Sequence, residues 1–413
     1  MALQPRQISS RPAAPCLPVD EFTGSRCIAF GEIMATPLQI LHLISSNRWT
    51  GVAEPAANLA QFQIQAGHEV RIGIIGDYTL QDALVARQLP MAQGLDLQRH
   101  YNPFGILKAK RALRNYILTN KVKVVHCHLL HDHWLSALAI RGLDKAHRPL
   151  LVRTSHRFDK LRTDWWHRWL FESATDLLIT VSEEQGQQHR EAYPKLAERI
   201  RVIYGGVDPE VFRPENDGSG IRTDMGEKPG ARIAGIVAHL GYNRGHKWLL
   251  KAVPALAQAV PEAIVWIVGQ GELRRTLRKE SRKPEYDRRV FLAGYRTTDL
   301  PETYAAMDCG LLLGLGSEGS ARAALETMAT GKPVIAVAKG ALAETITDGK
   351  DGYLLKENDV EGLSRCLIDL LGNPEKCAAM GRAARQTILD RFTGQRRFER
   401  TEAAYAEVMG RRG

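Results

Sequence analysis

An unusual concentration of histidines lies in the N-terminal third of the chain. The segment Val124–Trp134 reads VVHCHLLHDHW and holds four histidines, one cysteine and one aspartate. These are ligand types that zinc and iron prefer, so one interpretation is a metal site. The other is a set of polar residues at the carboxyl end of a strand, with His126 and His128 on the same side and lining a cleft. We favour the second interpretation because no distant Cys/His pair offers to complete a ligand set.

A second segment, Ser317–Glu326 (SEGSARAALE), combines two carboxylates with a predicted helix start. Gly319 and Ser320 leave backbone N–H groups at the helix N-terminus, where the helix dipole also favours an anion. Glu318 lies before the helix and Glu326 about two turns into it, and carboxylates accept hydrogen bonds strongly from hydroxyl groups. The pattern suits a ligand with hydroxyls on both sides of a diphosphate, a nucleotide sugar. The alternative is a capped amphipathic helix with two solvated glutamates.

Composition narrows the class of protein. The chain has 413 residues, a net charge of +10 and a hydrophobic fraction of 44%, which indicate two or three globular domains and anionic partners. Its six cysteines show no CxxC pair and no disulfide spacing, which favours the reduced cytoplasm. No apolar run approaches the roughly 18–20 residues that span a bilayer. Residues 1–30 are rich in proline and predict a flexible tail rather than a signal peptide.

Short apolar runs alternate with helical stretches from Leu38 onward, which predicts βαβ units, an α/β class and mostly parallel sheets. A polar, glycine-rich stretch at residues 215–230 divides the pattern in two. We therefore expect a first Rossmann-like domain at 31–212, a linker at 213–230, a second such domain at 231–390 and a closing helical segment at 391–413. Ligands of doubly wound sheets bind beyond the carboxyl ends of the strands, so two such sheets would face each other across a cleft. The predicted strands are 38–44, 69–75, 121–125, 150–154, 177–181, 200–203, 233–238, 263–268, 290–292, 310–313 and 333–338.

The chain resembles the retaining GT-B glycosyltransferases of family 4 (glycosyl transferases group 1), over nearly its whole length from Leu38. The most specific match is the E-x7-E pattern of Glu318–Glu326 and its continuation TMATGKPVIA. Other matching segments follow in the family's order. They are SNRWTGVAE at 46–54, AGHEV at 66–70, VVHCH at 124–128, TSH at 154–156, TVS at 180–182, IYGGVD at 203–208 and VGQG at 268–271. Within this resemblance the H-x-H pair lines the cleft, in an enzyme class that usually works without a metal ion.

The resemblance implies a role for each site residue. Glu318 would contact the transferred sugar, with His156 nearby, and Arg244 would stabilise the departing diphosphate. Glu326 would hold the ribose, and the glycine at position 51 would let the first loop approach the diphosphate. The donor-binding set is Gly51, His239, Arg244, Lys247, Gly319, Ser320, Ala321, Arg322 and Glu326, with no cofactor. His239 stands where the family usually has arginine and Arg244 where it has lysine, and an imidazole neutralises a leaving diphosphate less well.

The implied activity is a metal-independent, hexosyltransferase-type glycosyl transfer (EC 2.4) with retention at the anomeric carbon. The donor would be a nucleoside-diphosphate sugar and the acceptor a glycan or lipid-linked glycan in surface polysaccharide or lipopolysaccharide synthesis. The resemblance implies a front-face reaction in which cations and helix N–H groups stabilise the leaving charge. Two competitors stay open. One is a sugar phosphorylase or synthase on the same fold, and the other is a catalytically weak nucleotide-sugar-binding protein, motivated by His239. The resemblance further implies that the closing segment 391–413 returns to the first domain.

The segment Phe158–Phe171 (FDKLRTDWWHRWLF) bears on the acceptor side. One interpretation is a helix whose tryptophans pack on the sheet while its charges are solvated. The other is docking on an anionic membrane surface, because basic residues mixed with tryptophan suit a bilayer interface. That docking would place the cytoplasmic protein at the inner face of the cell membrane. The residues concerned are Lys160, Arg162, Trp165, Trp166, Arg168 and Trp169. No nucleic-acid-binding motif accompanies the positive charge, so we expect no nucleic-acid partner.

Overall fold

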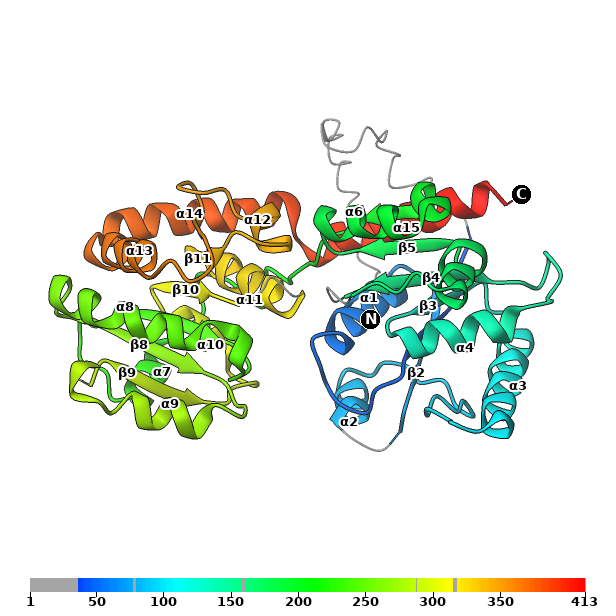
Figure 1. Cartoon of the computed structure of the whole chain (residues 1–413), viewed down its shortest axis with the longest axis horizontal. Helices are drawn as coiled ribbons and strands as arrows, with labels where there is room; N and C mark the ends of the chain where they lie inside the picture. Colours follow the sequence, from blue (N-terminus) through cyan, green and yellow to red (C-terminus); the bar gives the residue numbers. More distant parts are fainter. Residues whose placement is uncertain (1–35, 77–78, 157–159, 287, 315–317, 413) are drawn as a thin grey trace, which may run out of the picture. The chain divides into compact units, whose positions relative to one another are not determined.

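The computed structural model describes residues 36–412 except 77–78, 157–159, 287 and 315–317, and at 318–320 it describes the backbone only. The predicted tail at 1–30 thus lies outside the described residues. Leu38–Gly413 forms one compact unit, and its described part contains two six-stranded, all-parallel sheets with flanking helices (Figure 1). This confirms the predicted α/β class with two doubly wound sheets.

The first sheet has the strand order β2-β1-β3-β4-β5-β6. Its strands are β1 (Gln39–Ile44), β2 (Glu69–Ile74), β3 (Val124–Cys127), β4 (Leu150–Ser155), β5 (Leu177–Thr180) and β6 (Ile200–Val202). The α-helices between them are α1 (Ala53–Gln65), α2 (Thr79–Ala86), α3 (Pro103–Thr119), α4 (Leu130–Ile140), α5 (Trp165–Arg168) and α6 (Glu183–Ala192). A π-helix, η1 (Trp169–Ala174), continues α5, and a 3-10 helix, η2 (Pro194–Arg199), follows α6.

The second sheet has the order β12-β11-β10-β7-β8-β9. Its strands are β7 (Arg232–Val237), β8 (Ala263–Val268), β9 (Val290–Gly294), β10 (Cys309–Leu312), β11 (Val334–Val337) and β12 (Gly352–Leu355). The α-helices are α7 (Ser219–Asp224), α8 (His246–Ala259), α9 (Arg274–Glu280), α10 (Leu300–Ala306), α11 (Glu318–Ala329), α12 (Ala341–Thr345), α13 (Val360–Gly372), α14 (Pro374–Arg391) and α15 (Gly394–Gly410). Two 3-10 helices, η3 (Tyr242–Arg244) and η4 (Pro284–Tyr286), complete this half.

Alternation along the strands decides which residues of the first sheet meet which helices. Leu41 and Leu43 join the buried cluster that contains residues of α3, α4 and η1. Ile40 and Ile44 join the opposite cluster, which contains residues of α1 and α15. Because side chains alternate with a period of two, His42 lies on the face of α1 and α15. Both faces are covered, and this accounts for the continuous apolar runs by which these strands were predicted.

The closing helix α15 packs on the first sheet although it follows the second sheet in sequence. Thr393 caps it by accepting a hydrogen bond from the backbone N–H of Arg396 at 3.2 Å. Tyr405 and Val408 belong to the buried cluster of the first sheet, beside residues of β1. This placement brings Glu402 of α15 into contact with Gln63 of α1 and Tyr405 into contact with His126 of β3, as described below.

Three sequence predictions differ from the structure. The strand predicted at 121–125 begins at Val124, because Lys121 occupies a left-handed turn (φ 49°) after α3, and it extends through His126 and Cys127. The predicted linker at 213–230 contains helix α7, whose Ile221 is buried in a cluster of the second half. Strand β12 was not predicted, since its four residues are bounded by glycine and polar residues. The remaining boundaries of the proposed domains stay predictions.

Candidate active site

Both sheets direct their carboxyl-end loops to one cavity of about 1420 Å³. From the first half, the loop 49–52 after β1 and His156 after β4 line it. From the second half, the loops after β7, β8 and β10 contribute residues 237–239, 268–270 and 312–314. A position beyond the carboxyl ends of parallel strands is where doubly wound sheets bind ligands. The cavity is therefore the candidate active site.

Two glycines of the predicted VGQG segment allow the loops after β7 and β8 to approach closely. Gly269 and Gly271 have φ values of 145° and 156°. A Cβ atom at Gly269 would lie 1.9 Å from the carbonyl oxygen of Ala238, and one at Gly271 would lie 2.6 Å from that of Leu240. Any larger residue would push these loops apart and change the floor of the cavity.

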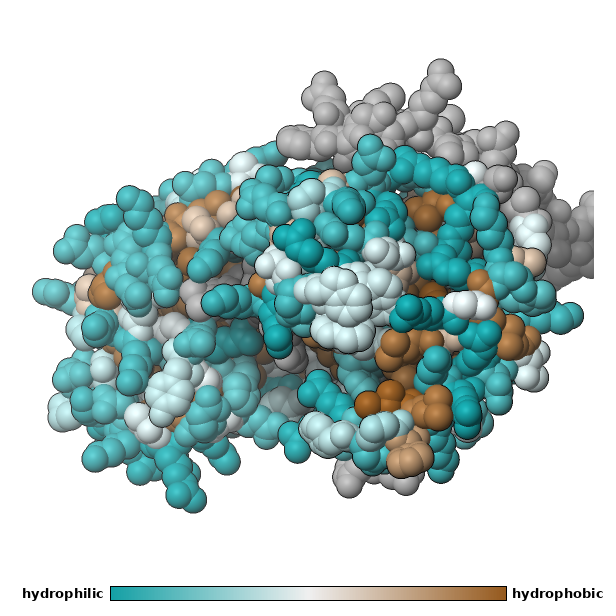
Figure 2. Space-filling model, turned by 45° about the vertical axis from the view of Figure 1, so that its right-hand side comes forward, coloured by the Kyte–Doolittle hydropathy of each residue, from teal (hydrophilic) through white to brown (hydrophobic). Residues whose placement is uncertain are grey.

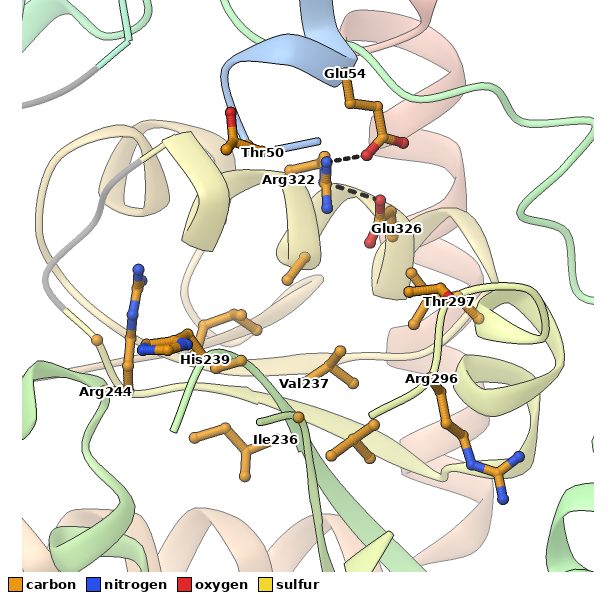
Figure 3. Close-up of a pocket in the computed structure, with 18 of the residues that line it drawn as sticks. Thr50, Glu54, Ile236, Val237, His239, Arg244, Arg296, Thr297, Arg322 and Glu326 are labelled. Carbon is orange, nitrogen blue, oxygen red and sulfur yellow. Dashed lines mark hydrogen bonds and ion pairs between the residues drawn. The ribbon is translucent and has the colours of Figure 1, made fainter. Parts of the chain in front are cut away.

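A buried carboxylate, Glu326, forms part of the cavity wall from helix α11. It accepts a hydrogen bond from the hydroxyl of Tyr304 at 2.8 Å, and Arg322 Nε lies 3.2 Å from its Oε1. Arg322 also pairs with Glu54 of helix α1, and Figure 3 shows Arg322 between the two carboxylates. Burial raises the pKa of Glu326 to about 7, and the nearby Arg322 opposes this shift. The carboxyl group is thus poised to lose its proton near neutral pH.

Arg244 and His239 stand at the opposite side of the cavity from Glu326 (Figure 3). Arg244 ends η3, and the next residue, Gly245, adopts φ 75° with its Cα packed against Leu313, where a Cβ would lie 2.3 Å away. Burial lowers the pKa of the Arg244 guanidinium, which nevertheless stays charged at neutral pH. His239 is largely exposed and its Nε2 contacts Glu272 Oε2 at 2.9 Å.

Four histidines form a buried cluster under the first-half side of the cavity. His42 Nδ1 lies 2.9 Å from His128 Nε2, and His128 Nδ1 lies 3.0 Å from His156 Nε2. His126 stacks on His128 with ring centroids 4.4 Å apart and bonds Tyr405 and Thr154, each at 2.6 Å. Of these four histidines only His156 lines the cavity, and both residues of the H-x-H pair are fully buried. The expectation that this pair lines the cleft was therefore wrong, because α1 and α15 cover its face of the sheet.

The hydrogen bonds of three buried histidines bear on the metal interpretation of the histidine segment. Among the described residues, His42, His126 and His128 have nitrogens within 4.8 Å of one another, a spacing that an ion could use. Each of their ring nitrogens, however, already has a hydrogen-bond partner. Burial lowers the pKa of all three imidazoles, which are neutral at pH 7. The cluster is thus a hydrogen-bonded core.

The other polar residues of that segment serve the local fold. His133 bonds the hydroxyl of Thr175 at 2.7 Å. Asp132 accepts hydrogen bonds from the backbone N–H groups of Ser45 at 2.8 Å and Leu129 at 3.0 Å, and so caps α4 and ties it to the loop after β1. The four histidines between 126 and 133 therefore do not converge on one point.

The structure brings together six of the predicted site residues at the cavity. They are Gly51, His156, His239, Arg244, Arg322 and Glu326. Lys247 is exposed and lies over the ring of Tyr242, and Ala321 is buried in α11 outside the lining. Glu318, Gly319 and Ser320 begin α11, but their side chains lie outside the described part of the chain.

Sequence reasoning missed several residues of the site. Glu54, which pairs with Arg322, closes the SNRWTGVAE segment but was given no role there, and Tyr304, which bonds Glu326, carries no pattern that separates it from ordinary helix residues. Gln63 and Glu402 join the histidine cluster from helices 339 positions apart in sequence. One signal was present: His126 and His128 are two positions apart at the end of one strand, so their common side was predictable. His42 and His156 join them through the register of β1, β3 and β4, which the sequence does not show.

The tryptophan segment divides between core and surface. Trp169 packs against the buried cluster that contains residues of α3, α4 and η1, and the centre of its ring lies 5.9 Å from that of Trp134. Trp165 and Trp166 are 65% and 54% exposed. The interpretation that these tryptophans pack on the sheet thus holds for Trp169 alone. In the described part of the chain, no helix combines the length and the apolar character that crossing a bilayer requires.

Comparisons with known proteins identify the family and the fold. The family described as Glycosyltransferase Family 4 matches residues 49–211, and the family described as Glycosyl transferases group 1 matches residues 220–387. The chain is 28% identical over 314 residues to the putative glycosyltransferase EpsD of Bacillus subtilis, covering 73% of this chain and 81% of that protein. It is 25% identical over 350 residues to an Escherichia coli UDP-Gal:α-D-GlcNAc-diphosphoundecaprenol α-1,3-galactosyltransferase, covering 82% and 87%.

One further relative matches over a shorter segment, and a solved structure matches the fold. A GDP-mannose-dependent α-(1-6)-phosphatidylinositol monomannoside mannosyltransferase of Mycolicibacterium smegmatis is 33% identical over 205 residues, which span 47% of this chain and about half (53%) of that protein. The crystal structure of Anabaena HepE in complex with UDP and glucose superposes with a TM-score of 0.75 at 20% identity, covering 89% of this chain and 99% of that chain. The two families together account for both halves of the cavity. The chain therefore belongs to the glycosyltransferases of family 4 and group 1, and it has the GT-B fold.

Proposed function

We propose that this glycosyltransferase moves a sugar, with retention, from a nucleoside-diphosphate sugar to a glycan or lipid-linked acceptor in surface polysaccharide or lipopolysaccharide synthesis. One observation carries the proposal. A single cavity collects a buried carboxylate (Glu326), a fixed cation (Arg244) and a histidine (His156) from two sheets. A sugar nucleotide presents hydroxyls, a diphosphate and a second set of hydroxyls, and these are the groups that such side chains bind.

The residues divide the proposed reaction between them. Glu326 would accept hydrogen bonds from the ribose hydroxyls, and Arg244 would stabilise the charge on the departing diphosphate. Backbone N–H groups at the start of α11 would add to that stabilisation, since a helix N-terminus favours an anion. Glu318 and His156 would contact the transferred sugar. The scheme needs no metal ion, because the cations are supplied by the chain.

The test is a thermal-shift screen against UDP-, GDP-, ADP- and dTDP-sugars, since a bound donor raises the melting temperature by mass action. We expect one nucleotide class to stabilise the wild type and not Glu326→Ala. Glu272→Ala, an exposed carboxylate near the cavity, is the matched control and should keep the shift. No shift with any donor, in proteins that remain folded, would contradict the proposal.

Product analysis separates the competing activities. NMR of the anomeric proton of the product reports retention or inversion. Adding inorganic phosphate tests the phosphorylase alternative, which predicts a sugar phosphate, and adding EDTA tests metal independence. Tight donor binding without turnover would favour the catalytically weak binding protein, for which His239 in place of arginine is the motivating feature.

For the acceptor side we propose docking on an anionic membrane surface. Trp165 and Trp166 are exposed, and their segment contacts α4, which also packs against the basic helix α3. Tyr101 and Phe104 at the start of α3 are 93% and 85% exposed. Brown apolar patches lie among hydrophilic residues on the right-hand side of the view in Figure 2, toward the first half of the chain. Exposed aromatic and basic residues together suit a membrane interface. The E. coli relative's acceptor is, by its name, a lipid diphosphate.

Flotation with vesicles tests this docking. We expect binding to phosphatidylglycerol vesicles and weaker binding to phosphatidylcholine vesicles, because the chain is basic. The double variant Trp165→Ala/Trp166→Ala should lose most of this binding. Tyr242→Ala removes an exposed aromatic from the second half and serves as the control. Equal binding by both variants would contradict the assignment of this surface.

A further inference from the structure

A chain of buried hydrogen bonds runs from helix α15 to the cavity. Gln63 Nε2 donates to Glu402 Oε1 at 2.9 Å, and Gln63 Oε1 lies 2.7 Å from His42 Nε2. The chain continues through the contacts of His42 with His128 and of His128 with His156 given above. All five side chains are at least 95% buried. These hydrogen bonds therefore connect a carboxylate on helix α15 to His156, the one histidine of the cluster that lines the cavity.

The carboxylate gives this chain a direction. A carboxylate can only accept, so Gln63 must turn its amide nitrogen toward Glu402 and its oxygen toward His42. His42 must then carry its proton on Nε2, which leaves Nδ1 to accept from His128 Nε2–H. The same step repeats at His128, whose Nδ1 accepts from His156 Nε2–H. His156 thus carries its proton on Nε2 and a lone pair on Nδ1.

A further histidine, His68, lies beside the other oxygen of Glu402. The backbone N–H of Leu38 donates to His68 Nδ1 at 3.1 Å, so the proton of this ring is on Nε2. That nitrogen lies 3.1 Å from Glu402 Oε2. Glu402 therefore accepts the hydrogen bond of Gln63 at one oxygen and has the His68 ring in close contact at the other, which places it as the acceptor at the end of the hydrogen-bonded chain.

The surroundings keep the histidine rings neutral. Burial lowers the pKa of His42 to about 4 and that of His128 well below its usual value. The positive Arg397 acts on both rings in the same sense, and the negative Glu402 opposes it at His42. Neutral His126 stacks on the chain without a hydrogen bond to it and bonds Thr154 and Tyr405 instead. The chain consequently sets tautomers and does not store a proton.

We propose that Glu402, Gln63, His42 and His128 are positioning residues that hold His156 in its Nε2–H tautomer, which makes Nδ1 the accepting nitrogen of this cavity-lining ring. The tautomer follows from the protein's own hydrogen bonds, and only its effect on turnover rests on the proposed function. The series of hydrogen bonds makes the protonation pattern of His156 depend on helix α15, which lies at the far end of the sequence.

Nitrogen-15 NMR of the histidine rings tests the tautomer directly, because protonated and unprotonated ring nitrogens give well-separated shifts. In the wild type we expect Nε2–H and bare Nδ1 at His156. Glu402→Gln keeps the shape but lets the amide at position 63 turn either way, so we expect mixed tautomers at His156. Turnover should fall by about tenfold, the effect of one misdirected hydrogen bond.

A swap of the two side chains provides the rescue. In Gln63→Glu/Glu402→Gln the carboxylate moves one step nearer to His42 and still only accepts, so the direction of the chain is kept. We expect the double variant to restore the single tautomer of His156 and most of the turnover. A merely structural need for a charge at position 402 would not be rescued in this way.

Thr154→Val is the matched control, because it removes a buried histidine hydrogen bond two residues from His156 but outside the chain. It should leave the His156 tautomer unchanged. An Nδ1–H tautomer in the wild type, or an unchanged spectrum in Glu402→Gln, would overturn the inference. These spectra need no substrate, so absence of turnover in the wild type would count against the proposed function alone.

Discussion

The two sides of the cavity solve the burial of polar groups in opposite ways. On the first sheet, histidines are buried as neutral rings, and each ring nitrogen of His42, His126 and His128 has a partner. On the second, Glu326 is buried as a carboxyl group with a pKa raised to about 7, beside the cation Arg322. The first arrangement fixes geometry, and the second keeps a charge available near neutral pH. This contrast teaches that a shared cavity can obtain its orientation from one half and its electrostatics from the other.

The largest effect is expected when the positive charge of Arg244 is removed. Arg244→Ala should lower turnover by about 10²- to 10³-fold, since a fixed donor that meets the leaving charge is worth that much in comparable sites. Arg244→Lys should recover part of it, because charge is kept while the paired donors are lost. Steady-state kinetics with the donor found in the screen measures both. A loss below fivefold in Arg244→Ala would show that the electrostatic work lies elsewhere in the cavity.

A change of pH should affect the two sides in opposite directions. His42 has a folded pKa of about 4, below its unfolded value of 6.5, so its contribution to stability is present above pH 6.5 and is lost as pH falls. Between pH 7 and pH 5 this loss is about 2 kcal/mol. Glu326 has a raised folded pKa, so its protonation stabilises the fold over the same interval by a similar amount.

Urea unfolding at pH 7 and pH 5 separates these two terms. Glu326→Gln removes the compensating term, and its free energy of unfolding should fall on acidification by about 2 kcal/mol more than that of the wild type. His42→Gln should reduce the acid sensitivity instead. If the free energy of unfolding of both variants changes with pH as it does in the wild type, His42 and Glu326 do not make opposite contributions to the pH dependence.

Donor affinity should report the charge on Glu326 with a smaller effect. In the proposed donor complex, only the ionised form of Glu326 accepts hydrogen bonds from both ribose hydroxyls. Donor affinity should therefore rise by about tenfold between pH 6 and pH 8, as a group with a pKa near 7 loses its proton. The pKa of Glu326 is raised even though two of the groups that face it, Arg322 and Tyr304, lower it, while the third, Glu54, raises it further. The expected direction of the pH dependence is therefore unchanged. Calorimetry with a sugar nucleotide, whose diphosphate does not titrate in this range, measures it. Glu326→Gln should bind weakly with no pH dependence, and an equal slope in that variant would assign the titration to another group.

The sequence was most informative where a segment acts alone and least where distant residues meet. Strand β8 was predicted at its observed residues, because six consecutive apolar residues between Glu262 and Gly269 leave little choice. Glu326 was found because the start of α11 carries a local pattern. The pairing of Arg322 with Glu54, 268 positions apart, and of Gln63 with Glu402 depends on how helices dock on sheets, which no local pattern contains. The H-x-H pair shows the same limit: its shared face was predictable, but the helices that bury it were not.

The smallest expected effect concerns the exposed edge of the second half. His239 occupies the position where the family resemblance led us to expect arginine, and here it contacts the exposed Glu272. Exposed pairs of this kind contribute little to stability, so His239→Arg should leave the melting temperature unchanged. A fixed charge at the cavity rim should raise kcat/KM by about threefold, the scale of a solvent-screened interaction with a diphosphate. Glu272→Gln tests whether the carboxylate restrains His239 and should change activity by less. A tenfold loss in His239→Arg would instead mean that the imidazole has a role that a permanent cation cannot fill, and the exposed edge would then belong to the geometry of the site rather than to its electrostatics.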